Sequence, residues 1–178
     1  ARRLAEDPKD VQALAWRGEL NLHRGRFESG LSDLRASVAR APEPHAQSVL
    51  AEALLDGLRS DFRRYRDSIP ELESLTKNSN LRQEFFWLVA QGLQSAGEPF
   101  AAFDRLTSLM NDDQLEEISQ HDSGIPLQVR NDRRISGLLA SLYQNVSPEV
   151  RRELDQKIRL QLPAEQGLES KALVQPLR

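Results

Sequence analysis

The segment that decides the fold is residues 11–44, which read VQALAWRGELNLHRGRFESGLSDLRASVARAPEP. Leu14, Gly18 and Leu22 fall four residues apart, and the apolar residues from 31 to 38 repeat at intervals of three and four. This spacing places each set on one face of an α-helix. The segment therefore predicts two helices in succession.

A turn is expected between these helices, at Arg24-Gly25-Arg26-Phe27. Gly25 can adopt the left-handed conformation that ends a helix, so the chain turns back there. Pro42 and Pro44 follow the second helix, and proline ends a helix because it lacks an amide donor and restricts the residue before it. Residues 11–44 thus predict an antiparallel helical hairpin.

A similar turn pattern recurs along the chain, at Arg59-Ser60-Asp61-Phe62 and at Ala96-Gly97-Glu98-Pro99-Phe100. The phenylalanines of the three turns lie 35 and then 38 residues apart. A period in the mid-thirties is typical of helical-hairpin arrays, in which each hairpin buries one side against its neighbour. We therefore expect three hairpins over residues 11–110.

The composition agrees with a globular, helical chain of one domain. Of the 178 residues, 29% are charged and only 6% are aromatic, and Ala, Leu, Arg, Glu and Gln outnumber the β-branched types. The absence of cysteine excludes disulfides, thiol catalysis and thiolate metal sites. A net charge of -3 gives no electrostatic reason to expect DNA, RNA or an anionic membrane as the main partner.

Residues 11–44 also resemble a tetratricopeptide repeat. Gly18 matches the small residue of the family pattern, Gly25 the glycine of the turn, Phe27 the aromatic residue after it and Pro42 the closing proline. The resemblance implies an all-α array of antiparallel helical hairpins in a right-handed superhelix. The first helix of each hairpin would then line a concave groove.

The next two units match this pattern less well. In residues 45–78, Pro70 interrupts the second helix, which we expect to kink or restart near Ser68. Residues 80–110 recover the small residue at Ala90. We assign structural roles at the helical turns to Gly18, Gly25, Phe27, Gly97 and Phe100.

The two ends of the segment are expected to depart from the repeats. Residues 1–10 contain Asp7-Pro8, which resembles the end of a preceding repeat. Residues 111–162 predict a short acidic helix, a loop and a divergent helical pair whose second member opens at Ser147-Pro148-Glu149, a typical helix start. Residues 163–178 predict a linker or strap because proline and glycine stand among polar residues.

The chain is expected to be a soluble piece of a longer protein. Residue 1 is not methionine, the first ten residues lack the apolar core of a signal peptide, and no run approaches the length that spans a bilayer. Any targeting signal would then lie outside the segment. Residues 54–72 are loosely similar to bacterial multidomain proteins that join tetratricopeptide-like helices to quinoprotein-type β-propellers.

No residue pattern indicates an enzyme, a metal site or a cofactor site. His121-Asp122-Ser123 holds the residue types of a hydrolase triad, but a working triad converges from separate elements. His23 and His45 lack a ligand partner at metal-binding spacing, and the acidic residues from 112 to 117 lack a glycine-bearing loop. The basic stretch from 59 to 66 is interleaved with aspartates, which argues against nucleic acid.

The two tryptophans are the candidates for partner binding. Trp16 and Trp87 fall at positions that tend to face the groove in the resembled family, where large aromatics anchor a peptide. The alternative is that they pack against their own chain. The candidate partner-binding residues of the concave face are Gln12, Trp16, Glu19, His23, Val49, Leu50, Glu84, Trp87, Gln91 and Gln94.

The leading hypothesis is a non-enzymatic scaffold that binds a peptide, a partner protein or another domain of the same chain in this groove. The alternative is an accessory helical domain of a larger multidomain enzyme or quinoprotein-like β-propeller protein.

Overall fold

The computed structural model describes residue 7, residues 10–110 and residues 131–161, and within these ranges the chain is all-α with no strand. The all-α prediction is thereby confirmed. The acidic helix and loop expected before residue 131, and the linker expected after residue 162, lie outside the described residues. The elements are α2 (Val11–His23), α3 (Phe27–Arg40), α4 (Pro44–Ser60), α5 (Phe62–Tyr65), the 3-10 turn η1 (Arg66–Ser68), α6 (Ile69–Thr76), α7 (Arg82–Ser95), α8 (Pro99–Met110), α10 (Asn131–Gln144) and α11 (Pro148–Gln161).

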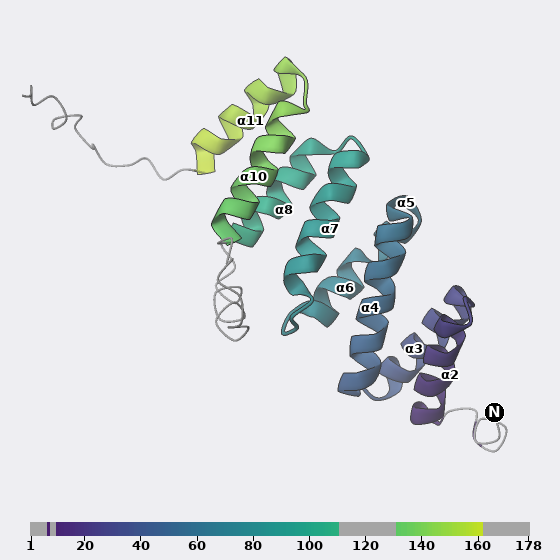
Figure 1. The fold of residues 1–178 in the computed structure, drawn as a ribbon. Helices are drawn as coiled ribbons and strands as arrows, with labels where there is room; N and C mark the ends of the chain where they lie inside the picture. The colour runs from purple at the N-terminus through teal and green to yellow at the C-terminus, as the bar shows by residue number, and fades with distance from the viewer. Residues whose placement is uncertain (1–6, 8–9, 111–130, 162–178) are drawn as a thin grey trace, which may run out of the picture.

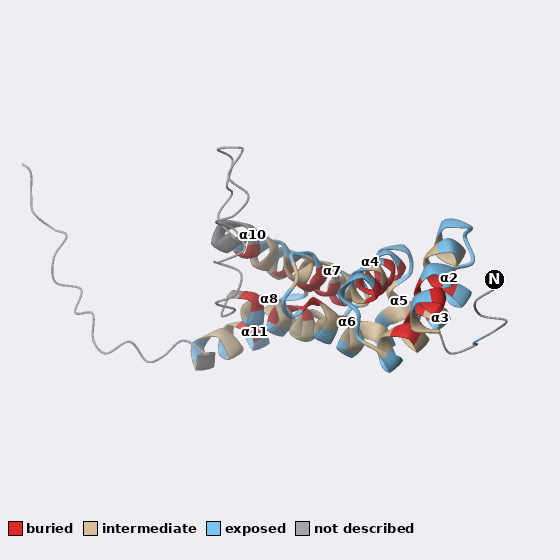
Figure 2. Ribbon diagram, turned by 90° about the horizontal axis from the view of Figure 1, so that it is seen from below, coloured by how far each residue is buried: buried red, intermediate tan, exposed pale blue. Residues whose placement is uncertain are grey.

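The helices follow one another in a single row, with α2 and α3 at one end and α10 and α11 at the other (Figure 1). Seen from below, the row has two layers, and buried residues lie where the layers meet (Figure 2). We call α2, α4, α7 and α10 the first layer and α3, α6, α8 and α11 the second layer. Along the row α3 packs on α4, α6 on α7 and α8 on α10.

Two turns in this row have the same backbone geometry. Gly25 has φ 71° and Gly97 has φ 80°, so both lie in the left-handed region that favours glycine. In each turn the residue after the glycine donates its N–H to a carbonyl five residues back, from Arg26 to Asn21 and from Glu98 to Leu93. This bond closes the last turn of α2 and of α7. The predicted roles of Gly25 and Gly97 are confirmed.

Gly18 has a different role from the one expected at a turn. It lies in the middle of α2, where a Cβ atom would stand 2.8 Å from Cγ of Leu34 and 3.0 Å from the carbonyl oxygen of Gly30. Gly18 therefore permits a close crossing of α2 and α3. Its assignment to a turn is wrong, because the small side chain serves helix packing.

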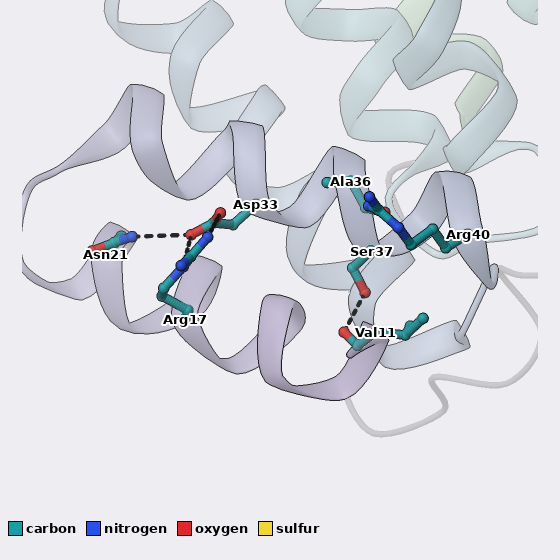
Figure 3. A network of polar contacts seen from close by, with 7 residues as sticks. All are labelled: Val11, Arg17, Asn21, Asp33, Ala36, Ser37 and Arg40. Carbon is teal, nitrogen blue, oxygen red and sulfur yellow. Dashed lines mark hydrogen bonds and ion pairs between the residues drawn. The ribbon is translucent and has the colours of Figure 1, made fainter. Parts of the chain in front are cut away.

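Polar contacts fix the same crossing on either side of this glycine (Figure 3). Arg17 binds Asp33 through two hydrogen bonds of 2.7 and 2.6 Å, and Asn21 donates a third to the same carboxylate. Near the start of α2, the hydroxyl of the buried Ser37 donates to the carbonyl of Val11 at 2.9 Å. The two helices of the first hairpin are thus joined by an ion pair near their middle and by a buried hydroxyl near the start of α2.

The second hairpin has an interrupted second helix, as the sequence predicts. The chain forms α5, passes through η1 and restarts as α6 at Ile69, one residue before Pro70. The predicted restart near Ser68 is confirmed. Proline is tolerated there because the N–H groups in the first turn of a helix have no acceptor within the helix, so the missing N–H of proline costs no hydrogen bond.

Ion pairs join successive hairpins along the second layer. Arg35 on α3 binds Glu71 on α6, with a closest contact of 2.7 Å, and also donates to Ser68. Arg105 on α8 binds Glu73 on α6 at 2.8 Å. The hydrogen bond from Arg105 lowers the pKa of Glu73 from its ordinary value of 4.5. Each of these pairs bridges neighbouring hairpins.

The last helical pair extends the row. Ile135 and Leu142 on α10 and Leu154 on α11 are buried in the same apolar cluster as the preceding hairpins. The predicted helix start at Ser147 is confirmed, since its hydroxyl accepts from the N–H of Val150 at 3.4 Å.

Candidate interaction surface

The first layer carries an open hollow of about 570 Å³ between α4 and α7. Trp87 and Leu88 supply its apolar wall. The remaining lining is polar and consists of Arg59, Asn80, Gln83, Glu84 and Gln91. α7 positions most of these groups because residues 84, 87, 88 and 91 recur at helical spacing on one face.

One arginine in the lining of the hollow is shared between two carboxylates. Arg59, near the end of α4, donates to Asp56 on its own helix and to Glu84 on α7. All three groups are substantially exposed to solvent, so the ion pairs contribute little to stability. Their main consequence concerns ligands. The hollow presents amides and an indole, while the guanidinium of Arg59 is already paired with carboxylates of the protein and so is a poor site for a ligand's carboxylate.

Three of the predicted residues meet in this hollow, namely Glu84, Trp87 and Gln91. Sequence reasoning missed Arg59, Asn80, Gln83 and Leu88 as members of the lining. In the sequence, Arg59 stands out only as part of a basic stretch. Its pairing across helices could have been anticipated from its place near the end of α4, which is next to α7 in the row.

Gln94 lies one turn further along α7 and lines a neighbouring hollow of about 670 Å³. This second hollow lies between the turn after α7 and the turn before α11. Gln91 lines both hollows, so they adjoin. The other lining residues are Ser95, Gly97, Pro99, Asn145, Val146, Ser147 and Val150.

The four predicted residues on α2 lie outside the hollow that Trp87 lines. Gln12 and His23 are exposed, and the side chain of Trp16 is 52% exposed. Glu19 is within 3.4 Å of His45 on α4 and within 4.0 Å of His23. The structure therefore does not bring Trp16 and Trp87 together in one pocket.

The predicted surface role of Leu50 is wrong. Leu50 is only 1% exposed and belongs to the apolar core, while Val49 is half-buried against it. The reason is that α4 is covered by neighbouring helices on several sides, by α3, α5, α6 and α7. Apolar residues therefore occur around most of α4, and their spacing alone does not reveal an exposed face.

Among the described residues, no group of three or more His, Asp or Glu side chains could hold a metal ion. The triad-like residues 121–123 lie outside the described ranges. Within the described part of the chain, none of the helices is long and apolar enough to cross a membrane.

Comparison of the chain with family models, with curated proteins and with solved structures gives no match. The assignment of a function therefore rests on the surface itself.

Proposed function

We propose that this chain is a non-enzymatic interaction module that binds a segment of a partner protein in the hollow at Trp87. The observation that carries the proposal is the combination of one indole and one leucine with three side-chain amides in an open depression of the first layer. Tryptophan supplies a large, rigid contact area, and such residues dominate the energy of many interfaces.

The chemistry of the lining favours an extended, uncharged polypeptide segment. The amides of Asn80, Gln83 and Gln91 each contain a donor and an acceptor, which suits the alternating groups of a peptide backbone. Arg59 is shared between Glu84 and Asp56, so this end of the hollow has one net negative charge and attracts a carboxylate of a ligand little. The expected ligand places one apolar side chain against Trp87 and Leu88.

Site-specific photo-crosslinking in the native host tests this proposal. A photoreactive amino acid is placed at Gln91, and the control carries it at Ser108, an exposed position on α8 in the second layer. We expect a discrete adduct from position 91 only. Trp87→Ala should reduce its yield about tenfold, the loss that corresponds to removing roughly 1.4 kcal/mol of binding free energy.

His23→Ala is the matched control, because His23 is exposed on the first layer but lies outside the hollow. It should leave the adduct unchanged. Equal yields from positions 91 and 108, or a yield that Trp87→Ala does not alter, would contradict the proposal. An adduct between two parts of one polypeptide would instead support the alternative of an accessory domain that docks within a larger protein.

A further inference from the structure

The outer face of α2 carries an uncovered apolar pair. Trp16 is 52% exposed and Leu20 is 46% exposed, and they are the large apolar side chains that are exposed among the described residues. They stand four residues apart and so share one face of the helix. Adjacent large apolar side chains in contact with solvent are typical of a surface that another element covers.

The second hairpin shows what lies at the equivalent positions. Phe27 and Phe62 follow the first and the second turn and are 35 residues apart. By this offset Trp16 corresponds to Ala51, and Leu20 to Leu55. Ala51 and Leu55 are 1% and 2% exposed. They belong to one apolar cluster with residues 31 and 34 of α3, and α3 packs on α4. Of the helices that pack on α4, α3 from the preceding hairpin makes the most extensive contact.

The third hairpin repeats the arrangement at the position of Leu20, whereas the position of Trp16 is held by Leu88, which lines the hollow at Trp87. Gly25 and Gly97 occupy the same place in their turns and are 72 residues apart, so Leu20 corresponds to Gly92. The ring of Phe62, from the preceding hairpin, lies directly over Gly92. In both internal hairpins, therefore, the position of Leu20 is covered. Leu55 is buried in a helix that packs on α3, and Gly92 lies against Phe62 of the preceding hairpin.

At α2 this partner is missing from the described residues, because α2 and α3 form the end of the row (Figures 1 and 2). The sequence before α2 nevertheless repeats the connection between α3 and α4, with Pro8 standing 34 residues before Pro42. The connection that contains Pro42 joins α3 to α4, the helix on which α3 packs.

We propose that the Trp16–Leu20 face of α2 is a stacking interface for the second helix of a further helical hairpin of the same polypeptide, preceding Asp7. The occupant is an amphipathic helix with an apolar ridge like that of α3. This inference concerns a different face from the hollow at Trp87 and does not depend on the proposed function.

The test compares the 178-residue chain with a chain extended at its N-terminus by about 34 residues of the encoded sequence, the length of one hairpin. Both carry Trp87→Phe, so that Trp16 is the sole tryptophan of the 178 residues, and any tryptophan in the extension is replaced by phenylalanine. In the extended chain we expect the emission of Trp16 to shift to the blue and its quenching by acrylamide to fall severalfold. Light scattering should show a monomer.

A pair of serine variants provides an independent measurement. Leu20→Ser should lower the unfolding midpoint of the extended chain and leave that of the 178-residue chain unchanged. Leu55→Ser, at the equivalent buried position, should lower both midpoints. The proposal is overturned if Trp16 is quenched equally in both chains, or if the encoded sequence offers no helical hairpin there. Concentration-dependent burial of Trp16 in a dimer of the 178-residue chain would overturn it as well, because the occupant would then be a second copy.

Discussion

The aromatic ring of Phe62 occupies the space that a side chain on Gly92 would fill. A Cβ atom built on Gly92 would stand 2.0 Å from one ring carbon of Phe62 and 2.2 Å from another. Phe62 belongs to α5 in the second hairpin, and Gly92 to α7 in the third. The glycine therefore sets how closely these two hairpins approach.

Gly92→Ala should consequently destabilise the protein. In an exposed helix the same change is favourable by about 1 kcal/mol, because alanine is the better helix former. Here the methyl group must displace an aromatic ring and a helix, and overpacking of this kind costs about 1–3 kcal/mol. We expect urea unfolding to show a net loss of up to about 2 kcal/mol.

Two controls separate the clash from other effects of the substitution. Gly137→Ala on α10 meets nothing within 4 Å and should stabilise the protein slightly. In a Phe62→Ala background, Gly92→Ala should change sign and become stabilising, because the ring is gone. A loss of stability that persists in that background would show that the ring is not its cause.

Gly25→Val should lower the free energy of unfolding by more than about 1 kcal/mol, because a β-branched residue is strained at positive φ. The φ of Gly25 is 71°, and a Cβ atom there would have nothing within 4 Å. The cost therefore comes from the backbone and not from a collision. Gly25→Asn should lose less, since asparagine tolerates the left-handed region better. An equal loss for both variants would point to a cause other than backbone strain.

The features that the sequence predicted correctly are local ones. The turns at Gly25 and Gly97 and the restart before Pro70 depend on the backbone freedom of single residues, which their identity reveals. Helical spacing likewise identified the all-α fold, since it needs no knowledge of distant neighbours.

The features that sequence reasoning missed depend on distant partners. Gly92 gives no signal by itself, because the ring that covers it comes from 30 residues earlier in the chain. Leu50 was placed on a surface because the resembled repeat exposes such positions, whereas several helices surround α4. The hollow at Trp87 was anticipated only in part, since Arg59 joins it through the packing of α4 on α7.

Trp16→Ala should change the stability of the 178-residue chain by less than about 1 kcal/mol, because half of the indole is already in solvent. Phe85→Ala is the contrasting variant, since Phe85 on α7 is fully buried and its truncation should cost about 3–5 kcal/mol. Thermal unfolding of both variants compares them directly. Similar losses for the two would show that Trp16 is part of the core.

The ion pair between Arg105 and Glu73 makes stability depend on pH in the acid range. Two hydrogen bonds, of 2.8 and 3.1 Å, join the guanidinium to the carboxylate. They lower the pKa of Glu73 in the folded protein below its ordinary value of 4.5. A carboxylate with a lowered pKa contributes stability that is fully present above its unfolded pKa and is lost as the pH falls through the folded pKa.

Glu73→Gln should therefore reduce the free energy of unfolding at pH 7, and the difference from the wild type should shrink as the pH falls below 4.5. Urea unfolding at several pH values between 7 and 3 measures this difference. Glu153→Gln, at an exposed position on α11, is the control for the loss of one negative charge. If the two variants show the same pH dependence, the effect comes from net charge, and the bond to Arg105 contributes nothing specific.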